Sequence, residues 1–187
     1  MIPSMTTVVF IHGYNASPEM NWYPEMRREL DNLRIPYRMP ALPGGDHPQI
    51  REWLKIIDQP VKSIKGDVVL VGHSLGTRAV LLYLERSKKP VKGVLLVSPF
   101  SNDLKNAGIR GQGYSDFFEH EIDLSEIKKL SPKFIVMHSK DDQRIPFEQG
   151  KEIAEELGAD FVVYEDKRHF SRPENHAEVL EQLKKLL

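Results

Sequence analysis

The segment Gly72-His73-Ser74-Leu75-Gly76 contains a serine whose neighbours favour nucleophilic chemistry. Four apolar residues at positions 68–71, three of them β-branched, precede it, and a helical pattern begins directly after the serine. This order of strand, tight turn and helix is typical of a nucleophile elbow, which presents a serine Oγ at the carboxyl end of a sheet. Glycines at 72 and 76 leave room where the strand and the helix come close. We therefore interpret Ser74 as a nucleophile, rather than as a chance serine in the turn after a buried strand.

A serine hydroxyl needs a base beside it, and the base needs a third group that fixes its tautomer. Only loops at the carboxyl ends of strands can reach Ser74 in such a sheet. Two later loops of this kind carry suitable side chains: one contains Asp141 and Asp142, and the other contains His169. The order serine, acid, histidine along the chain is that of an α/β-hydrolase. The sequence therefore predicts a catalytic triad.

Two adjacent acids compete for the third position of the triad. Asp142 is preferred because it stands four residues before Pro146, so that Asp-Gln-Arg-Ile-Pro joins the loop to the next helix. Asp141 remains the alternative. Among the seven histidines, His169 alone follows the final strand, whereas His12 is interpreted as a structural loop residue.

The loop at positions 12–18 follows the first apolar run and should complete the oxyanion hole. A backbone N–H at Gly13 or Tyr14 would face the N–H of Leu75, the first residue after the nucleophile. Together these donors would stabilise the negative charge that develops on a substrate carbonyl oxygen.

The segment 99–132 is less regular than the rest of the chain and is rich in glycine. We expect a mobile flap whose aromatic residues Tyr114, Phe117 and Phe118 line the substrate pocket, and we assign Trp22 to the same pocket. The alternative is ordinary core packing under a long loop.

The elements that must position these residues alternate along the whole chain. Apolar runs typical of buried strands occur at 6–12, 35–42, 68–71, 94–98, 134–138 and 161–164, and helical patterns separate them. Prolines 36 and 40 place the second run away from the centre of a sheet. This alternation predicts one α/β domain over residues 1–187 with a doubly wound, mostly parallel sheet.

Composition excludes several other classes of function. Lys and Arg number 26 against 27 Asp and Glu, so the net charge of -1 provides no strong field for nucleic acid or an anionic membrane. The absence of cysteine excludes disulfides, thiolate metal sites and cysteine nucleophiles. The His-Glu-x-x-His motif of zinc hydrolases does not occur in the sequence, so no metal site of that kind is indicated. Residues 1–5 are too short and polar for a signal peptide, and apolar runs have strand length, so we expect a cytoplasmic protein without a membrane span.

The chain resembles the small serine hydrolases of the retinoblastoma-binding-protein-nine type, a compact branch of the α/β-hydrolases, over essentially its whole length. The resemblance rests on these groups: His12-Gly13, Asn21-Trp22-Tyr23-Pro24, Met39-Pro40, Trp53-Leu54, Gly72-His73-Ser74, Gly113-Tyr114, Asp141-Asp142 with Pro146, and His169-Phe170. It implies a sheet of six or seven strands, no large cap domain and no metal or organic cofactor. It also carries the nucleophile to Ser74, the acid to Asp142 and the base to His169. A retinoblastoma-protein contact through Leu-x-Cys-x-Glu cannot be inferred, because this chain has no cysteine.

The leading functional hypothesis is a serine hydrolase that cleaves a small or medium carboxylic ester. An amidase, a peptidase or an acyltransferase would use the same residues, because leaving-group preference depends on the shape of the pocket. The alternative from another class is a binding protein on a hydrolase fold with weak or vestigial activity. We expect a small-molecule ester or amide as the partner, with no nucleic acid, no membrane and no obligate protein partner.

Overall fold

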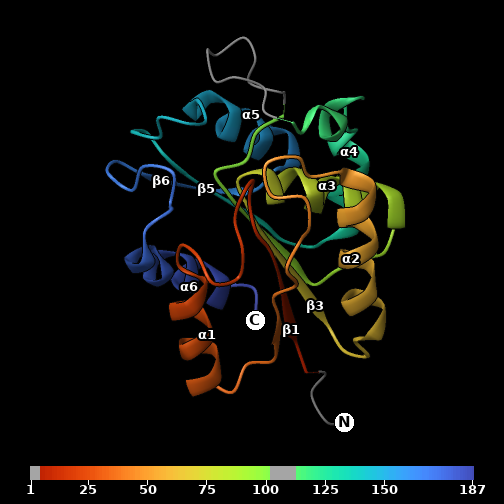
Figure 1. Ribbon diagram of the computed structural model, residues 1–187, viewed down its shortest axis with the longest axis vertical. Coiled ribbons are helices and arrows are strands. Elements are labelled where there is room, and N and C mark those ends of the chain that lie inside the picture. The colour runs from red at the N-terminus through yellow and green to blue at the C-terminus, as the bar shows by residue number, and fades with distance from the viewer. Residues whose placement is uncertain (1–4, 102–112) are drawn as a thin grey trace.

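The computed structural model describes residues 5–101 and 113–187. Within them lies a six-stranded sheet in the order β2-β1-β3-β4-β5-β6, and every neighbouring pair is parallel (Figure 1). The strands are β1 (Thr7–Ile11), β2 (Tyr37–Arg38), β3 (Val68–His73), β4 (Gly93–Val97), β5 (Phe134–Ser139) and β6 (Asp160–Tyr164). This confirms the α/β fold and the strand number expected from the sequence.

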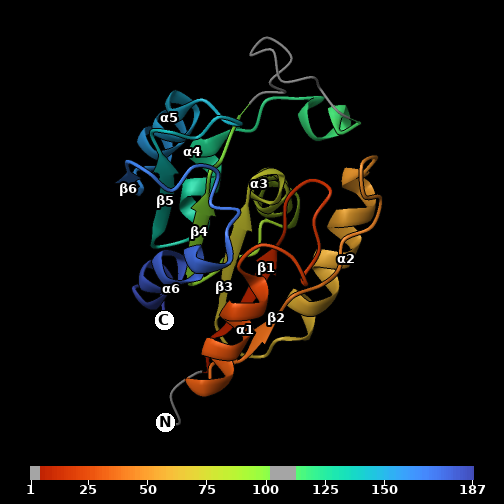
Figure 2. The same cartoon turned by 60° about the vertical axis from the view of Figure 1, so that its left-hand side comes forward.

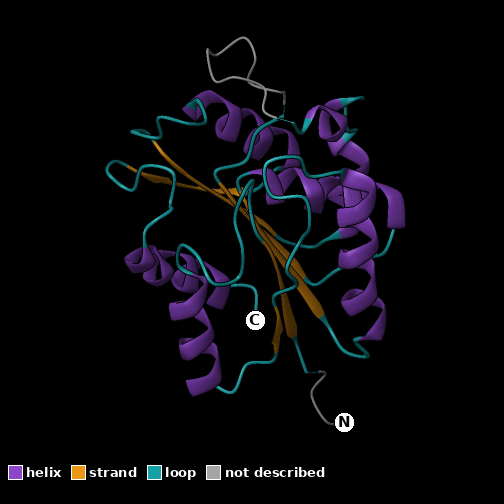
Figure 3. Cartoon of the chain, in the orientation of Figure 1, coloured by secondary structure: helices purple, strands orange, loops and turns teal. Residues whose placement is uncertain are grey.

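Helices cover both faces of the sheet (Figure 3). The α-helices are α1 (Tyr23–Asn32), α2 (Ile50–Ser63), α3 (Leu75–Ser87), α4 (Leu124–Ile127), α5 (Phe147–Leu157) and α6 (His176–Lys184). The short 3₁₀ helices are η2 (Ser115–Phe118), η3 (Lys128–Leu130) and η4 (Pro173–Asn175). Helices α1 and α6 pack on one face, and α2, α3, α4 and α5 supply the core of the other (Figures 1 and 2).

The strands separate two apolar cores because successive side chains point to opposite faces. In β1, Val8 and Phe10 join the core under α1 and α6, whereas Val9 and Ile11 join the core under α2 and α3. All five residues of this strand are buried. Burial on both faces explains why the central strands are continuous apolar runs rather than alternating ones.

The two edge strands differ from the central ones in composition. β2 pairs with β1 alone and consists of only two residues, because Pro36 and Pro40 lack the N–H groups that a longer ladder needs. At the other edge β6 pairs with β5, and its residues are partly exposed. The expectation that the second apolar run lies away from the centre is therefore correct.

Parallel pairing places the carboxyl ends of all six strands at one rim of the sheet. The chain reverses its direction of winding between β1 and β3, which are neighbours in the sheet although β2 lies between them in sequence. Ligands of open α/β sheets bind in the crevice outside such a switch point. The loop after β1 begins at His12, and Ser74 directly follows β3, so both flank this crevice.

Part of the expected flap lies outside the described residues, namely 102–112. The described remainder is packed rather than detached: Phe117, Leu124 and Ile127 are buried in the core. Arg78 of α3 holds this segment by donating hydrogen bonds to the carbonyl oxygens of Phe117 at 2.8 Å and His120 at 2.6 Å. Among the helices of residues 5–101 and 113–187, none has both the length and the apolar character needed to cross a membrane.

Candidate active site

Ser74 lies in a strained turn between β3 and α3. Its φ of 55° and ψ of -124° are rarely adopted by a residue with a side chain. The flanking glycines allow this turn, because a Cβ at Gly72 would lie 2.7 Å from the Gly76 carbonyl oxygen. A Cβ at Gly76 would lie 2.1 Å from the carbonyl oxygen of Ile11 in the neighbouring strand. The two glycines are therefore steric requirements of the elbow.

Hydrogen bonds join the three residues predicted to form the triad. His169 Nε2 lies 2.9 Å from Ser74 Oγ, and His169 Nδ1 lies 2.9 Å from Asp142 Oδ2. His169 follows β6, Asp142 follows β5 and Ser74 follows β3, so the chain reaches this point from three separate strand ends. The arrangement can move a proton from the serine hydroxyl to the imidazole while the carboxylate holds the ring.

The Asp142 carboxylate is fixed from several sides. Its Oδ1 accepts hydrogen bonds from the backbone N–H groups of Arg144 at 2.8 Å and Ile145 at 3.0 Å, and its side chain has no exposed area. Buried His138 also faces it, with Nε2 at 3.6 Å from Oδ2. Burial raises the pKa of Asp142, but the hydrogen bond and charge of His169 and the two backbone donors outweigh it and hold the pKa below its usual value. Asp142 is therefore maintained as a carboxylate.

Asp141 has a different set of partners. Its Oδ1 accepts hydrogen bonds from the Ser139 hydroxyl at 2.6 Å and from the Arg168 backbone N–H at 2.7 Å. Ser139 Oγ in turn accepts a hydrogen bond from the backbone N–H of Lys167 at 2.9 Å. Asp141 therefore ties the end of β5 to the loop that carries His169. Of the two acids that the sequence left open, only Asp142 contacts the imidazole.

The groups expected at the oxyanion hole lie beside Ser74. Leu75 is the first residue of α3, so its N–H has no partner within the helix and lies at the positive end of the helix dipole. Gly13 packs against the serine, since a Cβ placed on it would lie 3.0 Å from Ser74 Cβ. The Tyr14 side chain is held to the loop between β2 and α2 by a hydrogen bond from its hydroxyl to the Asp46 carbonyl oxygen at 3.0 Å.

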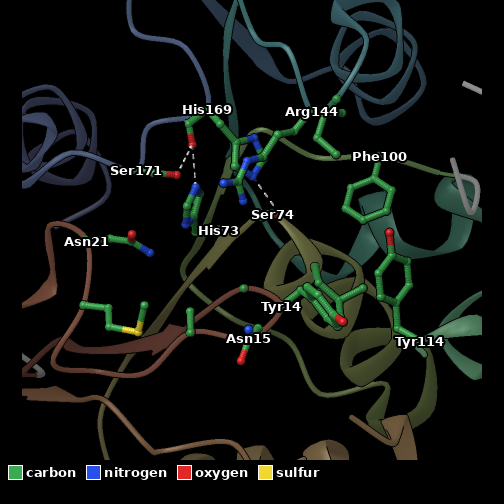
Figure 4. Close-up of a pocket in the computed structure, with 15 residues that line it drawn as sticks. Tyr14, Asn15, Asn21, His73, Ser74, Phe100, Tyr114, Arg144, His169 and Ser171 are labelled. Atoms are coloured by element: carbon green, nitrogen blue, oxygen red, sulfur yellow. Dashed lines mark hydrogen bonds between the residues drawn. The ribbon is translucent and has the colours of Figure 1, made fainter. Parts of the chain in front are cut away.

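A cavity of about 440 Å³ opens above these residues (Figure 4). Its lining comprises Gly13, Tyr14, Asn15, Ala16, Met20, Asn21, His73, Ser74, Leu75, Phe100, Tyr114, Arg144, Ile145, His169 and Ser171. Of the four aromatic residues predicted to line the pocket, Tyr114 does so. The cavity is of the size that small organic ligands occupy in proteins.

The structure places the other three aromatic residues elsewhere. Trp22 is fully buried against Phe10 and Tyr23 in the core under α1 and α6. Phe117 is buried with its ring 5.1 Å from Trp53 under α2. Phe118 covers the guanidinium of Arg78 at 4.9 Å. These corrections share one cause: an aromatic side chain near a loop is drawn into whichever apolar layer lies below it, and the sequence does not say which layer that is.

Phe100 and Arg144 are among the cavity-lining residues that the sequence analysis did not assign to the site. Both follow a strand at the rim where Ser74, Asp142 and His169 meet, Phe100 after β4 and Arg144 after β5. The signal in the sequence that could have identified them is their position shortly after a strand end.

Two further histidines lie near the site in neutral form. His12 accepts a hydrogen bond at Nε2 from the Leu42 N–H at 2.9 Å, so its Nδ1 carries the proton and donates to the Gly13 carbonyl oxygen at 2.9 Å. Burial lowers the pKa of His12 although the bond to Gly13 opposes the shift. The ring thus joins two loops at the rim, as the interpretation of His12 as a structural residue requires.

His73 supports the loop that carries His169. Its Nε2 donates to the backbone carbonyl oxygen of His169 at 2.8 Å, and the two ring centroids lie 5.1 Å apart. Its Nδ1 is buried and has no hydrogen-bond partner among the residues that the structure describes. Burial, followed by the charge of the neighbouring His169 ring, lowers the pKa of His73 to about 3.

This burial predicts a loss of stability in mild acid. Unfolded His73 takes up a proton near its ordinary pKa of 6.5, whereas folded His73 resists protonation down to about 3. The unfolded chain therefore binds more protons in this interval, and the free energy of unfolding falls as the pH falls, by about 1.4 kcal/mol per pH unit for such a histidine. His12 and His138 add to the same trend, because burial lowers their pKa values too. Urea denaturation between pH 7 and pH 4.5 measures the slope.

A His73→Gln variant should show a shallower slope over the same interval, since one buried titrating group is gone. His47→Gln is the matched control, because the side chain of His47 is 79% exposed, and it should keep the wild-type slope. An unchanged slope in His73→Gln would mean that folded His73 accepts its proton at an ordinary pH.

No group of three or more metal-ligating side chains (His, Cys, Asp or Glu) occurs in the part of the chain that the structure describes.

Comparisons with known proteins place the chain among hydrolases. The sequence model of the family described as Serine hydrolase matches residues 8–187. Serine hydrolase RBBP9 of Rattus norvegicus is 28% identical, with 99% of this chain and 96% of the rat protein aligned. YdeN of Bacillus subtilis (strain 168) is also 28% identical, over 89% of this chain and 87% of its own length.

Solved structures agree with the fold. The crystal structure of the B. subtilis ydeN gene product superposes with a TM-score of 0.85 at 26% identity and covers 97% of this chain and 98% of its own. The Paleococcus ferrophilus monoacylglycerol lipase has a TM-score of 0.74 at 17% identity and covers 99% of this chain and 96% of its own. The architecture is that of the α/β-hydrolases, as the resemblance in the sequence implies.

Proposed function

Because the chain belongs to the serine hydrolase family, we propose that it cleaves small or medium carboxylic esters through an acyl-enzyme intermediate on Ser74. The observation that carries this proposal is the hydrogen-bonded chain from Ser74 Oγ through His169 to Asp142, with both distances at 2.9 Å. A scaffold role requires no such alignment of three side chains from three strand ends.

In the proposed reaction His169 acts first as a base and then as an acid. Its Nε2 takes the Ser74 proton as Oγ attacks the ester carbonyl, and then gives that proton to the leaving alcohol. Asp142 accepts the hydrogen bond from Nδ1–H, which keeps Nε2 free to accept a proton and stabilises the imidazolium. A water molecule, activated by the same imidazole, then releases the acid.

The tetrahedral intermediates carry their negative charge on the former carbonyl oxygen. The N–H of Leu75 and an N–H of the Gly13-Tyr14 turn are the proposed donors. Removal of one such donor costs about 3 kcal/mol of transition-state stabilisation in serine hydrolases. The cavity of about 440 Å³ has room for a short or medium acyl chain.

Labelling with a fluorophosphonate probe tests the proposal directly. We expect one probe per folded chain, attached to the peptide that contains Ser74 and not to Ser171, which also lines the cavity. Ser74→Ala should abolish the labelling. A folded wild-type protein that takes up no probe would instead favour a binding protein with vestigial activity.

A further inference from the structure

The side chain of Arg144 lines the cavity that contains the nucleophile. Arg144 lies in the loop between β5 and α5, two residues after Asp142, and its backbone N–H binds the Asp142 carboxylate at 2.8 Å. This bond fixes the backbone of Arg144 next to the triad. Figure 4 shows its side chain extending from this loop toward the part of the cavity where His169 and Ser74 lie.

Among the described residues that line the cavity, none supplies a counter-charge for the guanidinium of Arg144. None of the described lining residues is Asp or Glu. The nearby carboxylate of Asp142 is fully buried, and its oxygens already bind His169 and two backbone N–H groups. Within residues 5–101 and 113–187, the Arg144 side chain forms no hydrogen bond or ion pair. Its five N–H donors are therefore available to a ligand.

Two lysines of the neighbouring loops pair with nearby acids. Lys140, at the start of the same loop, pairs with Glu165 at 2.7 Å and does not line the cavity. Lys167, in the loop of His169, pairs with Glu178 at 2.6 Å. Neither lysine lines the cavity, whereas Arg144 does.

The positive charge of Arg144 also reaches the interior of the site. Burial is the main cause of the low pKa of His73; the charge of Arg144 contributes in the same direction, and the larger effect of the Asp142 carboxylate opposes it. A charge that acts on a histidine adjacent to Ser74 in the chain will also act on an ester bound there. A guanidinium in this position favours an anionic ligand, and its planar fork matches a carboxylate with two parallel hydrogen bonds.

We infer that Arg144 binds a carboxylate of the substrate, so that the preferred esters are half-esters of dicarboxylic acids. This inference rests on the proposed function and adds the substrate class to it. The carboxylate would be held a few atoms from the scissile carbonyl, within the same cavity. Esters with a positively charged acyl chain would be disfavoured by the same guanidinium.

Three activated esters of similar length test the charge preference: mono-4-nitrophenyl glutarate, 4-nitrophenyl valerate and the 4-nitrophenyl ester of 4-(trimethylammonio)butyrate. The readout is the ratio of kcat/KM for the anionic ester to that for the neutral one. In Arg144→Gln this ratio should fall about tenfold, as expected for loss of a hydrogen-bonded charge pair. Arg144→Lys should retain part of the ratio, because a point charge remains without the fork.

Charge reversal and a matched control sharpen the test. Arg144→Glu should favour the cationic ester over the anionic one. Lys140→Gln removes a cation from the same loop outside the cavity and should leave the ratio at the wild-type value. Equal ratios in the wild type, Arg144→Gln and Arg144→Glu would overturn the inference, while hydrolysis of the neutral ester that depends on Ser74 would still support the proposed function.

A binding measurement covers the case in which none of the esters is cleaved. Monomethyl glutarate should raise the melting temperature of Ser74→Ala more than methyl valerate does, and this difference should disappear in the Ser74→Ala, Arg144→Gln double variant. An identical response of both proteins to monomethyl glutarate would overturn the inference independently of turnover.

Discussion

Ser74→Ala and His169→Ala are each expected to lower kcat for 4-nitrophenyl valerate by about 10⁶-fold, and the double variant should be no slower than either single one. The reason is that the hydroxyl and the imidazole act as one unit. Without the base at 2.9 Å the serine keeps its proton, and without the serine the base has no nucleophile to activate. Initial rates under saturating ester, with the uncatalysed rate subtracted, measure the three values.

The matched control is His47→Ala, which removes an exposed histidine from a loop before α2. It should hydrolyse the ester at the wild-type rate, and all variants should unfold at similar urea concentrations. Effects that add up in the double variant would show that the two residues act in separate steps. A Ser74→Ala variant within tenfold of the wild type would point to a different nucleophile.

The elbow and the strand alternation were predictable because their signals are local. A β-branched run followed by Gly-x-Ser-x-Gly leaves few backbone conformations open, and the close contacts at Gly72 and Gly76 show why glycine stands there. Parallel pairing then requires every strand to end at one rim. His169 could be selected for this reason, since topology alone brings the loop after β6 to the side of the sheet where Ser74 lies.

Choices between neighbouring residues depend on contacts that are distant in sequence. Asp141 and Asp142 are identical in type and adjacent in one loop. They are distinguished by the turn that directs one carboxylate to Arg168 N–H and the other to His169. The same limit explains why Trp22 was wrongly assigned to the pocket, since its burial against Phe10 depends on the packing of α1.

Arg144 could not be identified from the sequence for a different reason. Its proposed role depends on the absence of an acidic side chain among the described residues that line its cavity. A lone arginine in a sequence normally indicates a solvated surface. Its cavity contains no acid among the described residues, and this can be seen only once separate loops are assembled. Uncompensated charge is a property of the folded site.

The two acids give the sharpest test of the triad after the nucleophile itself. Asp142→Asn is expected to lower kcat/KM for a neutral ester by about 10⁴-fold, as in serine proteases in which the buried acid is replaced by its amide. An asparagine side chain can turn its NH₂ group toward His169 Nδ1, which stabilises the tautomer with the proton on Nε2. That tautomer cannot take the proton of Ser74, although the shape of the site is unchanged.

Asp141→Asn provides the comparison within the same loop. Asp141 contacts Ser139 and the backbone of Arg168 rather than the imidazole, so its loss should disturb the position of the loop and lower kcat/KM by no more than about tenfold, equivalent to about 1.4 kcal/mol. Steady-state kinetics of both variants on one ester determine whether Asp141 or Asp142 is the acid of the triad. If Asp142→Asn kept nearly the wild-type kcat/KM, the acid of the triad would have to be reassigned, because an amide at 142 would then leave proton transfer intact.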